Sequence, residues 1–564
     1  MSDAEYDRVL IKYPKAIAHL RRQLEDRRLG FILGAGVSTP YSFPDWSKLV
    51  ERVAMDPEVN AGSDYADSAF LPLPILTEVL YQRFRELNYE QCRIVSSSIG
   101  DVERLLLAKW RRVLHRALYA GTPTNDEELL KVDSAYKHFL GSIRQSSLTV
   151  TYNFDDVLER LLLQSRTSDQ KRTSQTFQTI VDPRPPFRRG LAIILHPNGY
   201  LPYNLMEVPS GTVVFSEGSF ADQLIDVMAG QYSTLLHYLT KHTFLLIGLS
   251  LSDESLRHML RQAARLSPGG YHYYIRFVPA GSEISEAAKR AEVASNFETY
   301  NLVTLHLSSS EINALGDILG DDVDDLRARA EELGVNLQYT YYLAGVPGAG
   351  KTTTFSHFNS FVTHDEWLEP RLALMSKPFT ELTKEQETQV DEWVLNQIGL
   401  KNRKMLDIAT KGSPGIHLID RCPPDAISFT NPADWSSKAK QVRAAISPRQ
   451  SKRQLHDGHV ILLAAQPEEV VVRAALCGKE TSVPYTMERH EDLQMLYLGS
   501  GTTELEVQRM SPTDVVKEVA RLVYFSEYTT AELDRRLKEV EDGTRQSPAR
   551  RQQSESAPAD HPPT

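Results

Sequence analysis

The sequence has few cysteines, no long apolar run and no excess of positive charge. Its 564 residues include three cysteines, Cys92, Cys422 and Cys477, and none lies in a C-x-x-C pair. A zinc site built from four cysteines is therefore impossible, and a disulfide scaffold is not expected. The most apolar stretch, from Phe244 to Leu249, is far short of the roughly 18 residues that span a bilayer.

Charge and N-terminal composition narrow the class of protein further. The 63 basic and 74 acidic residues give a formal net charge of −11, so no global field attracts nucleic acid. The first residues are acidic and contain no apolar core of a signal peptide. We therefore expect a soluble, cytoplasmic protein with no zinc, no membrane partner and no strong nucleic-acid signal.

Short apolar strands alternate with amphipathic helices in two blocks, which predicts an α/β fold with two mostly parallel sheets. The acidic segment between the blocks predicts a connecting helix, with the boundary near residue 335. The last residues contain no Val, Ile, Leu or Phe, so we expect a disordered tail. The expected parts are a first domain at 1–315, a linker helix at 316–337, a second domain at 338–540 and the tail at 541–564.

Strand positions follow from the apolar runs of each block. In the first block strands are expected at Leu29–Leu33, Ser147–Thr151, Leu191–Leu195, Thr243–Gly248, Tyr271–Phe277 and Val303–Leu307. In the second block they are expected at Gln338–Ala344, Gly415–Asp420 and Gly458–Ala464.

Polar residues follow four strands of the first block, at the edge where open α/β sheets bind ligands. The first strand turns through Gly34-Ala35-Gly36-Val37-Ser38 into a helix, so backbone N–H groups can approach a pyrophosphate. Position 39 is Thr, so the third glycine of G-x-G-x-x-G is missing. A helix cap or a plain turn explains each strand end alone, but four together favour a ligand site. The other three are Thr151-Tyr152-Asn153-Phe154-Asp155, His196-Pro197-Asn198-Gly199 and Gly248-Leu249-Ser250-Leu251-Ser252-Asp253.

Together with Pro44-x-Trp46, these motifs resemble the sirtuin-like fold of bacterial immune effectors over about residues 20–310. The resemblance implies that NAD⁺ binds at the carboxyl edge of the sheet. Asn153 would face the nicotinamide ribose, and Asp155 would support it. The other implied NAD⁺-binding residues are Gly34, Ala35, Gly36 and Ser38 at the phosphates, Trp46, and Ser250 and Asp253 towards the adenosine. Deacylating sirtuins usually carry a four-cysteine zinc ribbon, so the expected activity is NAD⁺ glycohydrolysis.

The third strand end departs from the family's pattern. Related effectors often place the histidine that acts as base directly before the glycine, where this chain has Asn198. His196 aligns with the first, non-catalytic histidine of that pattern. Asn cannot accept a proton near neutral pH, whereas His can. Three alternatives stay open: His196 acts from a shifted turn, the site binds NAD⁺ but hydrolyses it poorly, or a natural histidine has been replaced. The candidate catalytic residues are Asn153, Asp155, His196 and Asn198.

The second block carries a phosphate-binding loop. The segment Gly345-Val346-Pro347-Gly348-Ala349-Gly350-Lys351-Thr352 matches G-x-x-x-x-G-K-[ST] and lies between an expected strand and a helix from Thr353. In such loops backbone N–H groups hold the phosphates, the lysine reaches the terminal phosphates and the Ser/Thr hydroxyl binds Mg²⁺. We therefore expect ATP or another nucleotide with Mg²⁺, held by Thr352 and by Asp420 at the end of a later strand.

Further motifs indicate the kind of P-loop protein. Trp367-Leu368-Glu369-Pro370 follows the P-loop helix, Asp420-Arg421-Cys422 ends a strand, and Arg473 and Lys479 lie in a basic segment suited to a lid. This set resembles the deoxynucleoside and thymidylate kinases over about residues 338–530. The resemblance implies that Glu369, Asp420 and Arg421 surround the 5′ end of a nucleoside or nucleotide. Arg473 and Lys479 would act on the transferred phosphoryl group.

Two nucleotide-binding domains in one chain suggest a switch. The hypothesis is an antiviral effector in which the second domain senses or phosphorylates a nucleotide altered during phage infection, and the first then depletes NAD⁺. Sirtuin-like effectors commonly assemble, so a homo-oligomer is expected, with a phage-derived nucleotide or protein as trigger. One alternative is a nucleotide kinase whose first domain is an NAD⁺-binding pseudoenzyme. Another is a non-enzymatic scaffold that uses both pockets for assembly.

Overall fold

The chain forms two compact units in the computed structural model. The structure describes residues 3–62, 71–96, 98–165, 177–181, 190–205, 213–230, 232–282, 284–376, 381–447, 454–476 and 481–545. The first unit comprises residues 1–13 and 23–326, and the second comprises residues 14–22 and 327–564. Both are α/β, as predicted. Among the described residues, none of the helices combines the length and the apolar character needed to cross a bilayer.

The first unit is built on a seven-stranded sheet of order β3-β4-β2-β1-β5-β6-β7, whose neighbouring strands all pair in parallel. The chain leaves β1 first towards β2 and later towards β5, so β1 lies at the switch point where such sheets bind ligands. The strands are β1 (Leu29–Leu33), β2 (Thr149–Thr151), β3 (Phe177–Ile180), β4 (Ala192–Leu195), β5 (Thr243–Ile247), β6 (His272–Phe277) and β7 (Leu302–Leu307).

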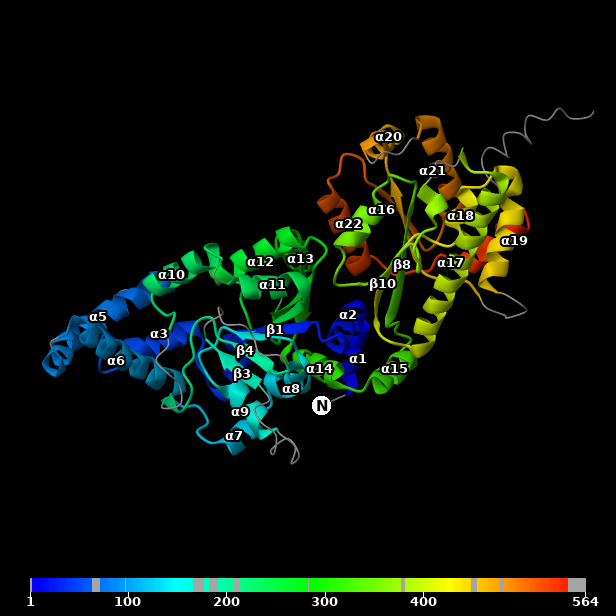
Figure 1. The fold of residues 1–564 in the computed structure, drawn as a ribbon. Coiled ribbons are helices and arrows are strands. Elements are labelled where there is room, and N and C mark those ends of the chain that lie inside the picture. Colours follow the sequence, from blue (N-terminus) through cyan, green and yellow to red (C-terminus); the bar gives the residue numbers. More distant parts are fainter. Residues whose placement is uncertain are drawn as a thin grey trace, which may run out of the picture. The chain divides into compact units, whose positions relative to one another are not determined.

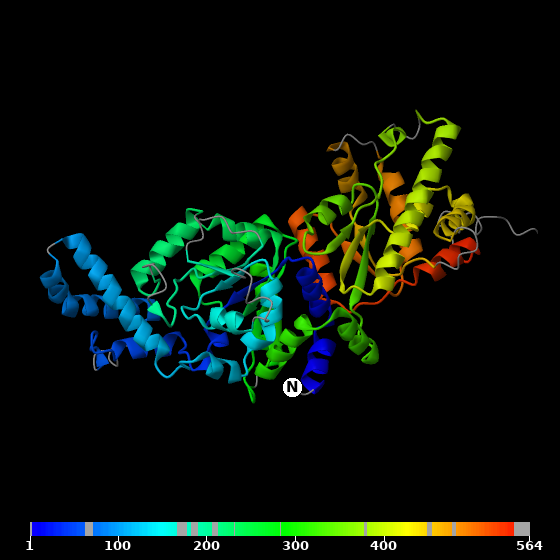
Figure 2. The ribbon, with the colours of Figure 1, turned by 60° about the horizontal axis from the view of Figure 1, so that its bottom comes forward.

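Helices cover both faces of this sheet (Figure 1). One face carries α11, α12 and α13, and the other carries α8, α9 and α14. The paired helices α5 and α6 extend away from the sheet (Figure 2). The helices of this unit are α1 (Asp3–Lys12), α3 (Trp46–Ala54), α5 (Leu73–Val95), α6 (Ile99–Tyr119), α7 (Asp126–Lys131), α8 (Ala135–Gln145), α9 (Val157–Gln164), α10 (Glu217–Met228), α11 (Ser233–Lys241), α12 (Glu254–Leu266), α13 (Glu286–Tyr300) and α14 (Ser309–Gly320).

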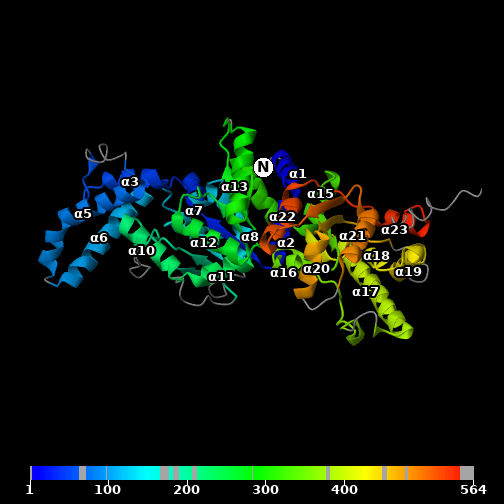
Figure 3. The ribbon, with the colours of Figure 1, turned by 90° about the horizontal axis from the view of Figure 1, so that it is seen from above.

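The second unit has a five-stranded parallel sheet of order β12-β11-β8-β10-β9. Its longest helix, α17, lies beside α19 (Figure 3). The strands are β8 (Gln338–Gly345), β9 (Val362–His364), β10 (Gly415–Asp420), β11 (His459–Ala464) and β12 (Thr502–Glu506). The helices are α2 (Pro14–Glu25), α16 (Lys351–His357), α17 (Lys384–Lys411), α18 (Asp425–Ser428), α19 (Trp435–Ile446), α20 (Pro467–Leu476), α21 (Val483–Tyr497), α22 (Pro512–Phe525) and α23 (Leu533–Glu541).

The division of the chain differs from the expected boundaries in two places. Residues 14–22 of α2 belong to the second unit, although they precede β1 in the sequence. The expected linker helix is instead two helices, α14 and α15 (Val323–Glu332), and the unit boundary falls after Leu326. Most of α14 is buried in the first unit through Ile312, Leu315 and Ile318, an apolar stripe of three-residue spacing. Residues 546–564 of the expected tail lie outside the described residues.

Candidate functional site

The glycine loop after β1 passes very close to the end of β5. A Cβ on Gly34 would lie 2.6 Å from the carbonyl oxygen of Gly248, and one on Gly36 would lie 2.9 Å from the Gly248 Cα. The N–H groups of Gly36 and Ser38 donate to the carbonyl oxygens of Gly248 and Ala35. The glycines therefore permit two loops to cross at the switch point. Ala35 and Gly36 are exposed at this crossing, whereas Ser38 is 1% exposed and faces inward.

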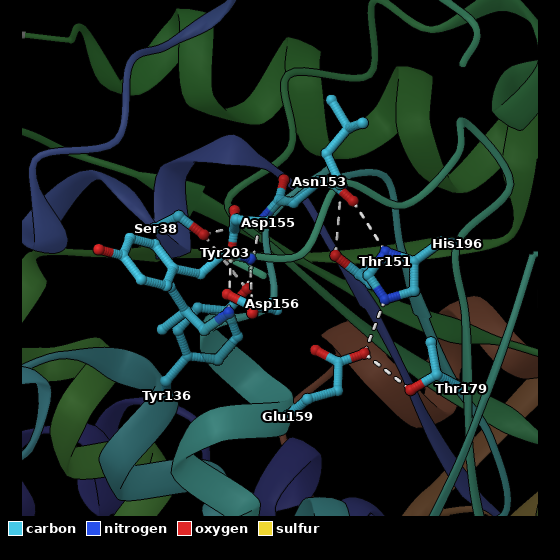
Figure 4. Close-up of polar contacts among 12 residues, drawn as sticks. Ser38, Tyr136, Thr151, Asn153, Asp155, Asp156, Glu159, Thr179, His196 and Tyr203 are labelled. Atoms are coloured by element: carbon cyan, nitrogen blue, oxygen red, sulfur yellow. Dashed lines mark hydrogen bonds and ion pairs between the residues drawn. The ribbon is translucent and has the colours of Figure 1, made fainter. Parts of the chain in front are cut away.

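Asn153 is held by a network of polar side chains (Figure 4). Its Nδ2 donates to the Gly34 carbonyl oxygen at 3.1 Å, to Ser38 Oγ at 3.0 Å and to the Tyr136 hydroxyl at 3.2 Å. Ser38 in turn hydrogen-bonds to the Asp155 carboxylate, and the N–H of Val157 donates to Asp155 Oδ1. The structure thus joins three of the predicted site residues, from the ends of β1 and β2, in one buried cluster.

Asp155 is a carboxyl group poised to titrate near neutral pH. Burial raises its pKa to about 7, and the hydrogen bond from Ser38 offsets part of that rise. Desolvation disfavours the charged form of a carboxylate, which is a common way in which sites tune a general acid or base. Among the predicted residues of this cluster, Asp155 therefore has the proton affinity that acid–base chemistry at neutral pH needs.

His196 is fully buried, and both of its ring nitrogens are engaged. Nδ1 donates to the Asn153 carbonyl oxygen at 2.9 Å, and Nε2 lies 2.8 Å from Glu159 Oε1, which also accepts from Thr179 Oγ1. Burial opposes the charged imidazole, but Glu159 and the Asn153 carbonyl outweigh it and raise the His196 pKa. A ring engaged at both nitrogens holds the loop of Asn153 in place. This geometry disfavours His196 as a base in the state described.

Asn198 is bound by Gln223, a residue of α10 that carries no sequence motif. Gln223 Nε2 donates at 3.0 Å both to Asn198 Oδ1 and to the carbonyl oxygen of Pro197. Its Oε1 accepts from Ser255 Oγ of α12. Both Asn198 and Gln223 are buried. Sequence reasoning missed Gln223 because it reaches the turn from a helix that is distant in the chain.

The remaining predicted NAD⁺-binding residues have local structural partners. Asp253 is the N-cap of α12 and accepts from the N–H of Leu256. Ser250 Oγ lies 2.6 Å from Ser252 Oγ on an exposed turn. Trp46 begins α3 and packs against three phenylalanine rings, with centroid separations of 6.2 Å to Phe154, 5.0 Å to Phe215 and 5.6 Å to Phe220. These contacts explain the residues structurally, and their predicted roles towards NAD⁺ stay predictions.

The P-loop of the second unit connects β8 to α16, as the motif requires. Gly345, Gly348 and Gly350 have φ of +146°, +90° and +101°, which side-chain-bearing residues rarely adopt. Lys351 folds back on the loop, and its Nζ donates to the carbonyl oxygens of Gly345 at 2.6 Å and Val346 at 3.0 Å. Burial lowers its pKa to about 8. The lysine is therefore held at the loop in the state described.

Thr352 and Asp420, the two predicted magnesium ligands, lie side by side. Thr352 Oγ1 donates to Asp420 Oδ2 at 3.3 Å, and the buried Oδ1 of Asp420 has no hydrogen-bond partner. Burial and the nearby Glu366 raise the Asp420 pKa. A hydroxyl and an unsatisfied carboxylate oxygen fit the oxygen ligands of Mg²⁺, which completes its shell with water and phosphate oxygens. Within the described ranges, no group of three or more His, Cys, Asp or Glu side chains is arranged to hold a metal ion.

The structure places Glu366, rather than the predicted Glu369, beside Arg421. Arg421 Nε lies 2.5 Å from Glu366 Oε1, and Arg371 lies 2.8 Å from Glu366 Oε2. Arg421 has a φ of +66°, a strained value at the end of β10. Glu369 instead accepts a hydrogen bond from Gln397 at 2.6 Å. The shift arises because the backbone N–H groups of residues 368 and 369 both bind Gln397, which fixes the direction of this turn.

A cavity of about 1360 Å³ opens over the P-loop. Its wall includes Lys401, whose Nζ donates to the Asp420 carbonyl oxygen at 2.6 Å and whose pKa burial lowers to about 8. Arg473 also lines it and pairs with Glu469 at 3.0 Å. Lys479 lies outside the described residues. The volume exceeds the roughly 300–1,000 Å³ of ordinary ligand pockets, so more than one small ligand fits. The P-loop part of the wall includes the predicted residues Gly348, Gly350, Lys351, Thr352 and Thr353.

Comparisons with known proteins find a family likeness for part of the first unit. A family model described as a SIR2-like domain matches residues 147–305, which run from β2 to β7. Residues 147–305 are thus similar to a SIR2-like domain, and this similarity indicates an NAD-related function for that part of the chain. No curated protein matches the chain significantly. Among solved structures, a thymidylate kinase from Ehrlichia chaffeensis aligns with 12% identity over 33% of this chain and 98% of its own, with a TM-score of 0.21.

Proposed function

We propose that the first unit cleaves NAD⁺ to nicotinamide and ADP-ribose. The observation that carries the proposal is the Asn153–Ser38–Asp155 cluster at the switch point of the sheet, in which Asn153 and Asp155 belong to the segment similar to a SIR2-like domain. Hydrolysis breaks the bond between nicotinamide and ribose, adds water to the ribose carbon and releases a proton. Asp155, with a pKa of about 7, can take that proton at neutral pH. Asn153 has both amide hydrogens engaged, so its Oδ1 is the atom left to orient the ribose or the water.

We further propose that nucleotide binding at the P-loop gates this activity. Support comes from the path of the chain, which passes from α1 in the first unit to residues 14–22 in the second and back to β1. In the second unit Lys15 Nζ donates to the carbonyl oxygens of Val523 and Ser526, and His19 Nε2 donates to that of Ser360, which follows the P-loop helix. A helix anchored there is followed by β1, which ends at Leu33 just before Gly34. Such coupling requires that the nucleotide bind the active state more tightly.

One experiment tests both parts of the proposal. The purified chain is incubated with NAD⁺, Mg²⁺ and a panel of nucleosides and nucleotides, and nicotinamide release is measured. We expect at least one nucleotide to raise the release, and we expect Asn153→Ala to abolish it. If no addition raises nicotinamide release above the Asn153→Ala background, the proposed function is wrong.

The wider role follows as a proposal from the resemblance to immune effectors. In it the protein is an antiphage effector, active as a homo-oligomer, and its trigger is a nucleotide or protein that infection supplies. Depletion of NAD⁺ would then stop growth of the infected cell. Mass measurement in solution with and without ATP tests the assembly, and expression with and without phage tests the role. A chain that stays monomeric under both conditions argues against the assembly.

A second candidate function is a nucleotide kinase regulated by a first unit that binds NAD⁺ without cleaving it. The buried, doubly bonded His196 and the asparagine at position 198 favour this candidate. It predicts ATP-dependent phosphorylation of a nucleoside or nucleotide that Asn153→Ala leaves unchanged. Absence of phosphoryl transfer to every nucleoside and nucleotide of the panel would remove it.

A further inference from the structure

The orientation of the Asn198 side-chain amide follows from its partners. The carbonyl oxygen of Pro197 can only accept, so the Gln223 atom 3.0 Å from it is the amide nitrogen. That nitrogen also contacts Asn198, so the Asn198 atom facing it is the oxygen. Ser255 Oγ, which donates to Gln223 Oε1, holds the glutamine from the other side. The chain of bonds from Ser255 through Gln223 to Asn198 therefore sets the polarity of Asn198.

The NH₂ group of Asn198 is left to donate. Among the described residues the Asn198 Nδ2 atom has no hydrogen-bond partner. It is also absent from the fully buried polar atoms without a partner, so this nitrogen is not fully buried. An amide nitrogen can donate but cannot accept a proton. Asn198 thus presents a hydrogen-bond donor at the carboxyl edge of the sheet.

Asn153 presents a hydrogen-bond acceptor at the same edge of the sheet. Its Nδ2 faces the Gly34 carbonyl oxygen, so its Oδ1 is the acceptor left over. The two asparagines follow the paired strands β2 and β4, and their loops are joined by bonds from His196 Nδ1 to the Asn153 carbonyl oxygen and from the Leu201 N–H to that of Phe154. A fixed acceptor and a fixed donor on adjacent loops match a group that both donates and accepts, as a sugar hydroxyl does.

We propose that Asn198 donates to a hydroxyl oxygen of the nicotinamide-side ribose and that Gln223 is the positioning residue that fixes this donor. The inference rests on the proposed function, because it takes NAD⁺ as the ligand of this edge. It goes beyond that function by giving position 198 a recognition role in place of the absent base. It also gives the α10 helix a part in specificity.

Binding of uncleaved ligands tests the proposal without reference to turnover. ADP-ribose carries the second ribose, whereas AMP lacks that ribose and the phosphate attached to it, so calorimetry with both separates this end of the ligand from the adenosine end. Asn198→Asp removes the donor at constant shape, and we expect it to weaken ADP-ribose binding about tenfold while AMP binding changes little. Lowering the pH protonates the new carboxyl group and restores a donor, so the loss should shrink towards pH 4, which a purely structural role would not produce.

Gln223→Glu provides the second arm. Its carboxylate accepts from the Asn198 NH₂, which turns the amide over and presents Oδ1 to the ligand. We expect the same loss as for Asn198→Asp, and the double variant should be no weaker than either single variant. Gln262→Glu makes the same change on α12, where the Gln262 amide contacts His258, and should bind as the unaltered chain does. Unfolding midpoints of all variants check the fold.

The outcomes separate this inference from the proposed function. If the unaltered chain binds neither NAD⁺ nor ADP-ribose, the proposed function fails and the inference fails with it. If the unaltered chain binds ADP-ribose and Asn198→Asp binds it equally well, the inference alone is overturned. Equal losses for ADP-ribose and AMP would likewise overturn it, because they would report a change outside the second ribose.

Discussion

The two units treat their polar groups in different ways. At the sheet edge of the first unit, Ser38, Asn153 and Asp155 bind one another, and each is less than 10% exposed. In the second unit the P-loop opens on a cavity of about 1360 Å³, and charged residues such as Arg421 and Arg473 line its wall as ion pairs. The first site is organised before ligand arrives, because its hydrogen bonds fix which atoms donate and accept. The second leaves its cations to be redistributed by phosphates.

Breaking the first network should give the largest effect. Asp155→Asn removes the group whose pKa is about 7, and we expect nicotinamide release to fall about 100-fold. In the unaltered chain activity should rise with pH through about 7, as the carboxyl group loses its proton. That inflection should be absent from the variant. Initial rates from pH 5 to pH 9 measure both effects.

Asp133→Asn is the matched control, because Asp133 is an exposed carboxylate of the same unit. It should leave both the rate and the pH profile unchanged. An Asp155→Asn variant that keeps the inflection would show that another group takes the proton, and would remove Asp155 from the proposed chemistry.

Breaking the second site should give a smaller effect, which is a loss of ATP affinity. Lys351→Ala removes the ammonium group that must leave the carbonyl oxygens of Gly345 and Val346 to reach phosphate. We expect ATP affinity to fall about 30-fold, the size of a lost charge-assisted hydrogen bond. Stimulation of nicotinamide release should fall with it, while basal release stays. Calorimetric titration with ATP and Mg²⁺ measures the first effect, and Lys404→Ala, at an exposed position of α17, is the control. Unchanged ATP binding would exclude the P-loop as the nucleotide site.

The smallest expected effect concerns acid stability of the second unit. Burial lowers the pKa of His364 to about 3 and that of His417 to about 4, and His364 Nε2 lies 3.1 Å from His417 Nδ1. Below about pH 6.5 the unfolded chain protonates both rings, whereas the folded unit does so only near pH 4. The contribution of the two rings is fully present above pH 6.5 and is lost as the pH falls, by up to about 2.7 kcal/mol per pH unit. The lowered pKa values of His456 and His459 act in the same direction.

Thermal unfolding between pH 7 and pH 5 measures this dependence. His417→Gln should reduce the slope by about one proton, or roughly 1.4 kcal/mol per pH unit, whatever its effect on stability at pH 7. His357→Gln alters a half-buried histidine of the same unit and should keep the full slope. A slope unchanged by His417→Gln would mean that the pair does not stay neutral in the folded unit.

The strands that sequence reasoning located are the central ones and the fully buried edge strand β7. β1 and β10 have the predicted bounds, and the other predicted strands differ only by a few terminal residues. The missed strands, β3, β9 and β12, are short or polar and only partly buried at sheet edges, as in Thr502–Glu506. Their pairing comes from backbone hydrogen bonds to a neighbour, which leaves little apolar pattern to detect.

The residues of the candidate sites likewise fall into those that sequence patterns reveal and those that they do not. The P-loop and the polar strand ends are visible in the sequence because one segment supplies several residues at fixed spacing. Gln223, Glu366 and Lys401 carry no motif, since each reaches its site from a separate element. Sequence reasoning could not place residues 14–22 in the second unit either. The pattern of an amphipathic helix shows that one face is buried, but it does not specify which domain the helix packs against.

The sequence by itself determined the α/β class, the phosphate-binding loop and the residue types at the strand ends. These depend on local spacing and on the burial of apolar runs. The tertiary structure alone decided the state of those residues. It gives both ring nitrogens of His196 a hydrogen-bond partner and raises the pKa of Asp155 by burial. It also fixes, through Gln223, which atom of the Asn198 amide faces outward. Proton affinity and hydrogen-bond direction depend on partners that are distant in the chain, and only folding brings those partners together.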